Sequence, residues 1–454
     1  MKWGKMTTLE ENPKISFVSL GCDKNLVDSE VMLGLIDKEG YEITSEEEAD
    51  AIVINTCGFI MDATSEGIET VLRLSEMKKQ GKAKALIVTG CMAQRYQKEI
   101  FKELPEVDAV VGTTQFQKLP QVLKEVMAGN QVAYLANRNT PMPEELFMLR
   151  KPTNTHFAYL KISEGCDQNC TYCTIPSIRG THRSRSIESL VEEATMLANK
   201  GARELIIVAQ DSTHYGTDMY GYNALHELLA ELSKIEGVRW LRILYAYPEH
   251  ITDETIEEMA NNPKVLPYLD MPIQHSHDAI LKTMGRNMTN QRLRAIIGNL
   301  REKIPHISIR TTLIVGFPGE DEIHFLNLIE FIKEMRFDRL GVFTYSKEEG
   351  TPAGEMENQV DEEIKQFRKS VVMEVQEEVS KEKLQERIGD VMTAIVEKHY
   401  GTNSYLARTY MDCYEIDGHV NFDYDGELNI GDFVHVKITH SLDHDLAGQV
   451  VQVL

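Results

Sequence analysis

The chain is poor in long apolar runs and in positive charge. No stretch of its 454 residues approaches the ~20 continuous apolar residues of a membrane span, and we expect no secretory signal at its start. Only 48 Lys and Arg stand against 71 Asp and Glu, so the formal net charge is −23. Because nonspecific nucleic-acid binding rests on cationic surface, this composition disfavours it. A basic partner or a small-molecule substrate suits such a charge better.

Cysteine is also scarce. The seven cysteines are an odd number, and they are not spaced like a disulfide framework. We therefore expect a reducing compartment, the cytoplasm, where clustered thiols indicate metal binding or catalysis. Cys413 stands alone and is expected to be a packed thiol. The other six form two sets of three: Cys22, Cys57 and Cys91, and Cys166, Cys170 and Cys173.

The first set of cysteines ends three similar segments. The β-like runs 14–22, 51–57 and 85–91 each end in a cysteine, and each precedes a helical pattern. Strands alternating with helices predict a parallel α/β sheet, in which ligands collect at the carboxyl ends of the strands. A single cysteine in such a place is most simply a small buried hydrophobe. Three of them predict a shared metal site along one edge of the sheet.

The central region alternates strands and helices six times. Strand candidates lie at 156–163, 204–209, 239–245, 266–270, 306–315 and 338–345. Helical patterns lie between and after them, at about 188–200, 223–235, 252–261, 276–284, 290–303 and 321–336. Six βα units fit an open, incomplete barrel better than a closed eight-stranded one, and site residues are expected on the loops after the strands. A charged helix follows at roughly 361–386 and is expected to be solvated.

The last region has a different character. Short β-like runs punctuated by Gly-Asp pairs predict a small five-stranded barrel of the OB-like kind. The sequence thus predicts an α/β protein with an N-terminal parallel α/β domain (1–140), a linker carrying Pro141 and Pro143 (141–152), a partial barrel (153–386) and a terminal β-barrel (387–454).

The second set of cysteines is compact. Cys166, Cys170 and Cys173 lie within eight residues, in the loop after the first barrel strand. Three thiolates can ligate three irons of a cubane and leave the fourth iron open to a substrate or cofactor. Zinc is the competing metal, but a structural zinc site needs a fourth ligand at short range, and His182 is the only near candidate. The pattern favours an iron–sulfur cluster.

These motifs carry a family resemblance. Cys166-x3-Cys170-x2-Cys173 resembles the cluster motif of the radical S-adenosylmethionine (SAM) superfamily, and the three-part order resembles its methylthiotransferases, which end in a TRAM module. Further segments resemble the RimO-type ribosomal protein aspartate methylthiotransferases: Ser19-Leu-Gly-Cys-Asp-Lys-Asn-Leu-Val-Asp-Ser29, Ser163-Glu-Gly-Cys166, Gln210-Asp211 before Tyr215-Gly216, and Tyr268-Leu-Asp-Met-Pro-Ile-Gln-His275. Asp23 departs from the pattern, since proline is expected there; it adjoins a ligand without being one.

The resemblance implies two 4Fe-4S clusters and SAM. The cluster on Cys166, Cys170 and Cys173 would bind SAM at its open iron and generate a 5′-deoxyadenosyl radical. A second cluster, implied for Cys22, Cys57 and Cys91, would present a sulfur atom at its own open iron. The radical would remove hydrogen from an unactivated carbon, which then attacks that sulfur. A second SAM would supply the methyl group.

Other candidate site residues are less specific. As cofactor-binding residues we predict Tyr172, Gln210, Asp211, Gly316, Gly319 and Glu320. Two of these predictions have plain alternatives: Tyr172 as a packing aromatic, and 316–320 as an ordinary strand-to-helix turn. Gln210 and Asp211 follow a strand and are expected to make polar contacts to cofactor or substrate. The basic residues Arg179, His182, Arg183 and Arg185 either orient an acidic group or, as we prefer, form a solvated loop paired with nearby acids.

Three functions are compatible with two sets of three cysteines. The first is methylthiolation of the β-carbon of an aspartate in small-subunit ribosomal protein twelve, the second is methylthiolation of a transfer-RNA adenosine, and the third is electron transfer without a substrate. Incomplete ligation at both sites disfavours the third. Residues 385–454 hold 12 acidic and 4 basic side chains, a net −8 that suits a basic protein better than RNA. We expect the first function, with an electron donor such as flavodoxin or ferredoxin, no membrane partner, and nucleic acid disfavoured as the direct substrate.

Overall fold

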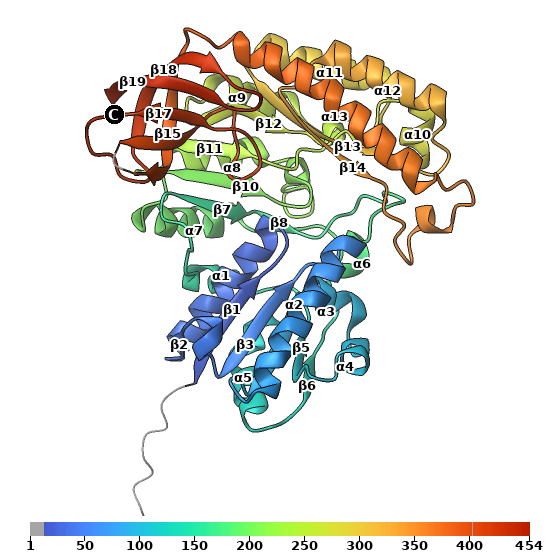
Figure 1. Ribbon diagram of the computed structural model, residues 1–454, viewed down its shortest axis with the longest axis vertical. Helices are drawn as coiled ribbons and strands as arrows, with labels where there is room; N and C mark the ends of the chain where they lie inside the picture. Colours follow the sequence, from blue (N-terminus) through green and yellow to red (C-terminus); the bar gives the residue numbers. More distant parts are fainter. Residues whose placement is uncertain (1–12, 402) are drawn as a thin grey trace, which may run out of the picture. The chain divides into compact units, whose positions relative to one another are not determined.

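The computed structural model describes residues 13–401 and 403–454 (Figure 1). The chain divides into two compact units. The first comprises the residues up to Thr153 together with Thr174–Thr181, and the second comprises Asn154–Cys173 and His182–Leu454. The chain therefore leaves the second unit directly after Cys173, contributes eight residues to the first, and returns at His182. No helix in the described part of the chain is both long and apolar enough to cross a bilayer.

The first unit is built on a six-stranded sheet whose strands all pair in parallel. Its order is β2-β1-β3-β4-β5-β6, with bounds Glu42–Ile43, Lys14–Ser19, Ala51–Thr56, Ala85–Gly90, Ala109–Val111 and Val132–Tyr134. Its helices are α1 (Asp23–Lys38), α2 (Met61–Lys79), α3 (Cys91–Tyr96), α4 (Glu99–Glu103), α5 (Leu119–Met127) and the inserted α6 (Ile175–Arg179). Every residue of β3 and β4 is buried, as their continuous apolar sequences predict for central parallel strands. The predicted parallel α/β fold is confirmed.

The segment predicted as a linker packs closely in this unit. It contains the 3-10 helix η3 (Glu144–Leu149), whose Phe147 is buried. Arg150 Nε donates to Glu30 Oε2 at 2.5 Å, and both side chains are buried. The domain boundaries drawn from the sequence stay a prediction.

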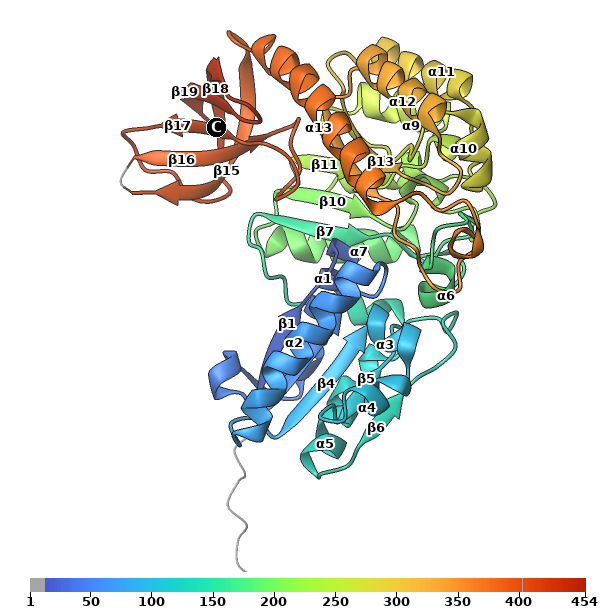
Figure 2. The ribbon, with the colours of Figure 1, turned by 45° about the vertical axis from the view of Figure 1, so that its right-hand side comes forward.

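The second unit contains an open parallel sheet of six strands in the order β14-β13-β12-β11-β10-β7. Figure 1 labels all six strands, and Figure 2 shows β7, β10, β11 and β13 from a second side. Their bounds are Arg339–Thr344, Ser308–Val315, Val265–Asp270, Trp240–Ile243, Glu204–Val208 and Phe157–Lys161. The helices are α7 (Ile187–Asn199), α8 (Leu225–Ser233), α9 (Asp253–Asn261), α10 (Asp278–Thr283), α11 (Asn290–Lys303), α12 (Glu322–Met335) and α13 (Glu362–Gln385). A short ribbon joins β8 (Ser163–Glu164) to β9 (Arg183–Ser184). The predicted open (βα)6 partial barrel is confirmed.

Short 3-10 helices complete both units: η1 (Glu46–Glu48), η2 (Phe116–Lys118), η4 (Ser212–His214), η5 (Pro248–His250) and η6 (Pro352–Glu355).

The prediction that the charged helix is solvated was wrong for one face of α13. Val372 is fully buried, and Lys365 and Arg368 are nearly so. Lys365 Nζ donates to the carbonyl of Tyr345 at 3.0 Å, and Arg368 Nη1 donates to Glu320 Oε1 at 2.8 Å. Long cationic side chains bury their stems when their heads find acceptors, so charge along a helix does not by itself indicate exposure.

The last region forms a closed barrel of five strands in the order β15-β16-β17-β19-β18, as predicted. Their bounds are Val391–Tyr400, Ser404–Thr409, Val420–Asp423, Leu446–Val453 and Phe433–Ser441. Buried ion pairs attach this barrel to the partial barrel within the same unit. Glu204 on β10 accepts from Arg242 Nε at 2.6 Å and from Arg408 Nη2 at 2.5 Å, and all three side chains are fully buried.

Candidate cluster and cofactor sites

The first three thiols lie where the sequence predicts, beyond the carboxyl ends of β1, β3 and β4. Adjacent strand ends are in register, with Ser19 opposite Asn55 and Thr56 opposite Gly90. Cys22 is exposed, Cys57 is half-buried and Cys91 is buried. Burial, with smaller contributions from the neighbouring Cys22 and Cys57 thiols, raises the pKa of Cys91 to about 12, while Arg179 acts against the rise. The three sulfurs are therefore close enough to interact, and a thiolate there needs a compensating positive charge.

Glycine and asparagine allow this approach. Gly21 has φ +87°, and a Cβ on it would lie 2.8 Å from Cys57 Cβ, so no other residue fits between the two cysteines without a shift. Asn25, in the first turn of α1, donates from Nδ2 to the carbonyls of Leu20 and Thr56, which belong to two neighbouring strand ends. Its Oδ1 lies 3.6 Å from Cys91 Sγ. Asn25 thus holds the backbone around the thiols.

The basic stretch after Cys173 is not a solvated loop. Arg179, Arg185 and His182 are all buried. Arg185 Nη1 pairs with Glu193 at 2.5 Å. Arg179 belongs to the first unit, where its guanidinium contacts Asp28 and Asn25. The pairing with acids was predicted correctly and the solvation was not, because a charged side chain can be buried once its partners surround it.

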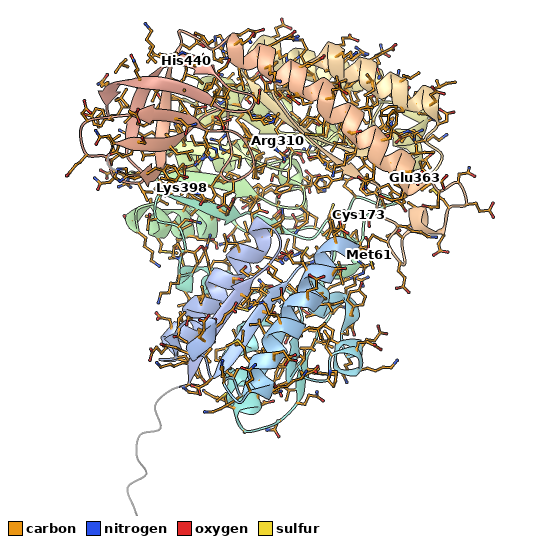
Figure 3. All side chains as sticks on the ribbon, viewed as in Figure 1. Met61, Cys173, Arg310, Glu363, Lys398 and His440 are labelled. Atoms are coloured by element: carbon orange, nitrogen blue, oxygen red, sulfur yellow. The ribbon has the colours of Figure 1, made fainter. Side chains whose placement is uncertain are left out.

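The second three thiols lie on the loop between β8 and α6, and Figure 3 labels Cys173. The backbone of Thr171 anchors this loop on both sides: its N–H donates to the carbonyl of Met284, and its carbonyl accepts from Ala353. Gly285 (φ +74°) lets the loop pass closely, since a Cβ there would lie 2.7 Å from the carbonyl oxygen of Asn169. Cys166 and Cys173 are half-buried, and Cys170 is buried.

Two residues beside Cys170 were not predicted. Tyr247 places its hydroxyl 2.6 Å from Cys170 Sγ, and the Arg286 guanidinium carbon lies 3.6 Å from the centre of the Tyr247 ring. Arg286 pairs with Glu249 at 3.1 Å, while its Nη1 is buried without a hydrogen-bond partner. Tyr247 follows β11, whereas Arg286 follows α10, and neither carries a short-range motif, so spacing along the chain contained no signal for them.

The predicted glycine loop lies beside the second thiols. Tyr172 and Phe317 are in edge-to-face contact, with ring centres 6.4 Å apart. Glu320 shapes the loop from within: Oε2 accepts from the backbone N–H of Gly316 at 2.9 Å, and Oε1 accepts from Arg368. Two neighbouring loops therefore carry these predicted residues: the cysteine loop carries Tyr172, and the loop after β13 carries Gly316, Gly319 and Glu320. Glu320 is largely engaged by the protein itself.

Gln210 and Asp211 follow β10 as predicted and face different partners. Gln210 Nε2 donates to Glu164 at 3.3 Å, and its buried Oε1 has no hydrogen-bond partner. Asp211 Oδ2 lies 2.7 Å from His250 Nδ1. Asp211, His214 and His250 also bring ligand atoms within 4.8 Å of one another, but the His214 and His250 rings are stacked at only 29°. Imidazoles bind metals in the ring plane, and two nearly parallel planes do not converge on one ion.

The donor chemistry favours clusters over zinc at both cysteine sets. Among the described residues, Asp211, His214 and His250 form a group with potential ligand atoms within 4.8 Å of one another, and this group includes no cysteine. A structural zinc site needs four protein ligands, and each set offers three thiols. His182 directs Nε2 to the Ser184 hydroxyl at 3.1 Å. Three thiols without a fourth ligand fit a cubane with one open iron.

Three family matches cover successive parts of the chain. Residues 14–112 match the uncharacterized protein family UPF0004, residues 160–332 match the radical SAM superfamily, and residues 388–451 match the TRAM domain. An open parallel barrel with a Cys-x3-Cys-x2-Cys loop, in a segment matching this superfamily, defines a radical SAM enzyme.

Comparison with curated proteins gives the family. The chain is 48% identical to the ribosomal protein uS12 methylthiotransferase RimO of Acetivibrio thermocellus, over 96% of this chain and 98% of that protein. It is 47% identical to the RimO of Desulforamulus reducens (97% and 100%) and 45% identical to that of Clostridioides difficile (96% and 99%). The chain belongs to the RimO family of ribosomal protein uS12 methylthiotransferases.

Solved structures resemble this chain in fold. The radical SAM methyltransferase TsrM from Kitasatospora setae, with cobalamin and a [4Fe-4S] cluster bound, aligns with a TM-score of 0.55 at 12% identity, over 76% of this chain and 77% of that one. The cobalamin-dependent radical SAM enzyme OxsB, with aqua-cobalamin and SAM bound, aligns with a TM-score of 0.50 at 13% identity, over 80% and 56%. At such identities the likeness concerns the fold alone.

Proposed function

We propose that this protein transfers a methylthio group to the β-carbon of an aspartate in ribosomal protein uS12. The observation that carries the proposal is the identity of 45–48% to uS12 methylthiotransferases along nearly the whole chain. The two sets of three thiols support it, since the chemistry needs two open-iron sites. The relatives named here act on a ribosomal protein, which disfavours the transfer-RNA alternative.

The two cysteine sets divide the chemistry. Cys166, Cys170 and Cys173 hold a 4Fe-4S cluster that binds SAM, and Cys22, Cys57 and Cys91 hold a second 4Fe-4S cluster. When bound, these groups supply a carbon-centred radical at the first site and sulfur at the second. The protein binds and orients the cofactor and the substrate, and it excludes water from the site. A one-electron donor such as flavodoxin or ferredoxin and a cytoplasmic location accompany this proposal.

The residues around Cys170 are suited to hold a zwitterionic cofactor. The unpartnered Nη1 of Arg286 offers a buried charge-assisted donor for a carboxylate. The half-buried ring of Tyr172, backed by the fully buried ring of Phe317, offers an apolar face for a base, and the backbone of Gly319 is exposed nearby in the same loop as Phe317. Gln210 Oε1 is a further buried acceptor. We assign Tyr172, Gln210, Asp211, Gly316, Gly319 and Glu320 to cofactor contact or to shaping its site.

The terminal barrel supports a basic substrate. Part of its charge is internal, because Glu397 and Asp412 are buried beside arginines. Over residues 385–454, seven acids are exposed, against two exposed lysines: Glu386, Asp390, Glu415, Asp423, Asp425, Glu427 and Asp443, against Lys398 and Lys437. The surface is therefore acidic after the buried pairs are set aside, which favours encounter with a basic ribosomal protein.

The proposal is tested by iron analysis and a paired substrate assay. Anaerobically reconstituted protein should contain about eight irons, and the Cys166/Cys170/Cys173→Ala variant about four. Wild type should modify uS12 and leave transfer RNA unmodified, while both triple-cysteine variants should lose activity. Cys413→Ala is the matched control, because Cys413 is buried in the terminal barrel region and should keep full iron and activity. Modification of transfer RNA but not uS12 would overturn the proposal.

A further inference from the structure

Arg179 is an unexpected neighbour of the first thiols. It follows Cys173 by six residues, yet α6 carries it into the first unit, beside α1 and α3. Its side chain is 2% exposed. Nη2 donates to Asn25 Oδ1 at 2.6 Å, and both terminal nitrogens lie 3.2 Å from Asp28 Oδ2. The segment that directly follows the Cys166–Cys173 motif in the sequence therefore supplies a residue beside Cys22, Cys57 and Cys91.

The contacts of Arg179 point toward the sulfurs. Asn25 Oδ1, which accepts from Arg179, lies 3.6 Å from Cys91 Sγ, and the guanidinium also acts electrostatically on Cys57 and Cys91. When a cluster is bound, Cys91 has no proton to donate to this carbonyl oxygen. The guanidinium then neutralises the oxygen dipole that faces the sulfur.

Arg179 places a positive charge among the thiols and the acids near them. Lys24 and Asp23 form a pair at 3.2 Å, and Arg179 and Asp28 form a second pair. Three iron-bound thiolates add negative charge in a partly buried place. Net charge and hydrogen bonding near the sulfurs are principal controls of a cluster's reduction potential, and a nearby cation stabilises the reduced, more negative state.

We propose that Arg179 is a positioning residue of the N-terminal cluster: its guanidinium offsets the charge of the ligands Cys22, Cys57 and Cys91 and raises the reduction potential of the cluster they hold. The inference rests on the second cluster of the proposed function. It assigns to the radical SAM loop a second role, which is to tune the sulfur-presenting site.

The test uses the full chain with Cys166, Cys170 and Cys173 changed to Ala, so that any cluster present is the N-terminal one. In this parent, Arg179→Gln keeps donors for Asp28 and Asn25 and removes the charge, whereas Arg179→Lys keeps the charge. Iron, acid-labile sulfide and the midpoint potential are measured by anaerobic titration. Arg73→Gln is the matched control, because Arg73 is an exposed arginine of the same unit paired with Glu46.

We expect Arg179→Gln to retain about four irons and to have a more negative reduction potential than the parent. Arg179→Lys should have a potential close to that of the parent, and Arg73→Gln should change neither the iron content nor the potential. Loss of iron in Arg179→Gln but not in Arg179→Lys would also support the role of charge. An unchanged potential with iron retained, or equal iron loss in both variants, would overturn it. A parent without iron would instead refute the second cluster of the proposed function.

Discussion

Small residues next to the cysteines decide whether the thiols can meet. Gly21, between β1 and Cys22, adopts a left-handed backbone conformation and packs against Cys57, leaving no room for a side chain of its own. Asn25 bonds to two strand ends at once. Cys22, Cys57 and Cys91 are the proposed ligands, and their convergence depends on neighbours that are not proposed to bind metal.

Gly21→Ala should remove the N-terminal cluster selectively. The added Cβ meets Cys57 Cβ at 2.8 Å in a backbone conformation that L-residues avoid. Reconstituted iron should fall from about eight to about four per chain, with SAM cleavage retained. Gly81→Ala is the control: Gly81 has φ +72° but nothing within 4 Å of its Cβ position, so iron should stay complete. Full iron in Gly21→Ala would contradict the packing argument.

His275 makes folding stability depend on pH. It is fully buried, and burial lowers its pKa from 6.5 to about 3, so it folds in the neutral form. Below pH 6.5 the unfolded chain binds a proton that the folded chain excludes, so stability falls as the pH drops from 6.5 towards 3. The slope is up to about 1.4 kcal/mol per pH unit from this residue.

His275→Asn should flatten that slope. The asparagine oxygen can still accept from the His277 backbone N–H, which His275 Nδ1 binds at 3.0 Å. Urea unfolding between pH 4 and 7 measures the change, with the exposed His444→Asn as control. Equal slopes in His275→Asn and wild type would refute the assignment.

At the scale of elements, one buried carboxylate joins a loop to a distant helix. Glu320 accepts from Gly316 in its own loop and from Arg368 on α13, 48 residues further along the chain. Burial raises the pKa of Glu320, while these donors act against the rise. The loop beside Tyr172 therefore takes its shape partly from a helix that contributes nothing to the motif.

Glu320→Gln should weaken SAM binding. An amide has one acceptor oxygen where two are used, so one donor loses its partner at a cost of about 1–3 kcal/mol. If about half of that appears in binding, the dissociation constant rises roughly two- to twelvefold. Anaerobic equilibrium dialysis of reconstituted protein measures it. Glu322→Gln, an exposed change two residues away, should bind as wild type does; identical affinity in both variants would count against this role.

At the scale of the whole molecule, the terminal barrel and the partial barrel share a buried electrostatic network. Arg242 and Arg408 pair with Glu204, Arg408 also bonds to Glu397, and Glu397 lies 2.6 Å from His156. Arg310, labelled in Figure 3, pairs with Asp270 on the neighbouring strand at 2.8 Å. Removing residues 387–454 would uncover several of these charges, so truncation tests stability as well as substrate binding.

Glu204→Gln should destabilise the second unit by about 3–5 kcal/mol, because two buried guanidiniums lose their common counter-charge. The two arginines lower the pKa of Glu204 against the effect of burial, so the carboxylate is charged at neutral pH. Chemical denaturation measures the loss. Glu231→Gln removes an exposed pair with Lys234 and should cost at most about 1 kcal/mol. Similar losses in the two variants would show that the network is not coupled.

The sequence by itself determined the succession of strands and helices along the chain and the two sets of cysteines. Apolar runs followed by cysteine predict buried parallel strands, and the carboxyl ends of such strands necessarily share an edge. The six barrel strands and the five-stranded terminal barrel follow from equally local patterns. These features were predictable because each is encoded within one or two turns or strands.

The tertiary structure alone decided which polar residues support the sites. Arg179 leaves its own motif to join the first unit, and Tyr247 reaches Cys170 from a distant loop while Arg286 stacks on the Tyr247 ring. Helix α13 buries cations that a local pattern assigns to solvent. The physical reason is that a charged or aromatic side chain is placed by its partners, and those partners lie far away in sequence. Local periodicity records which face of an element is apolar; it does not record which distant charge will meet it.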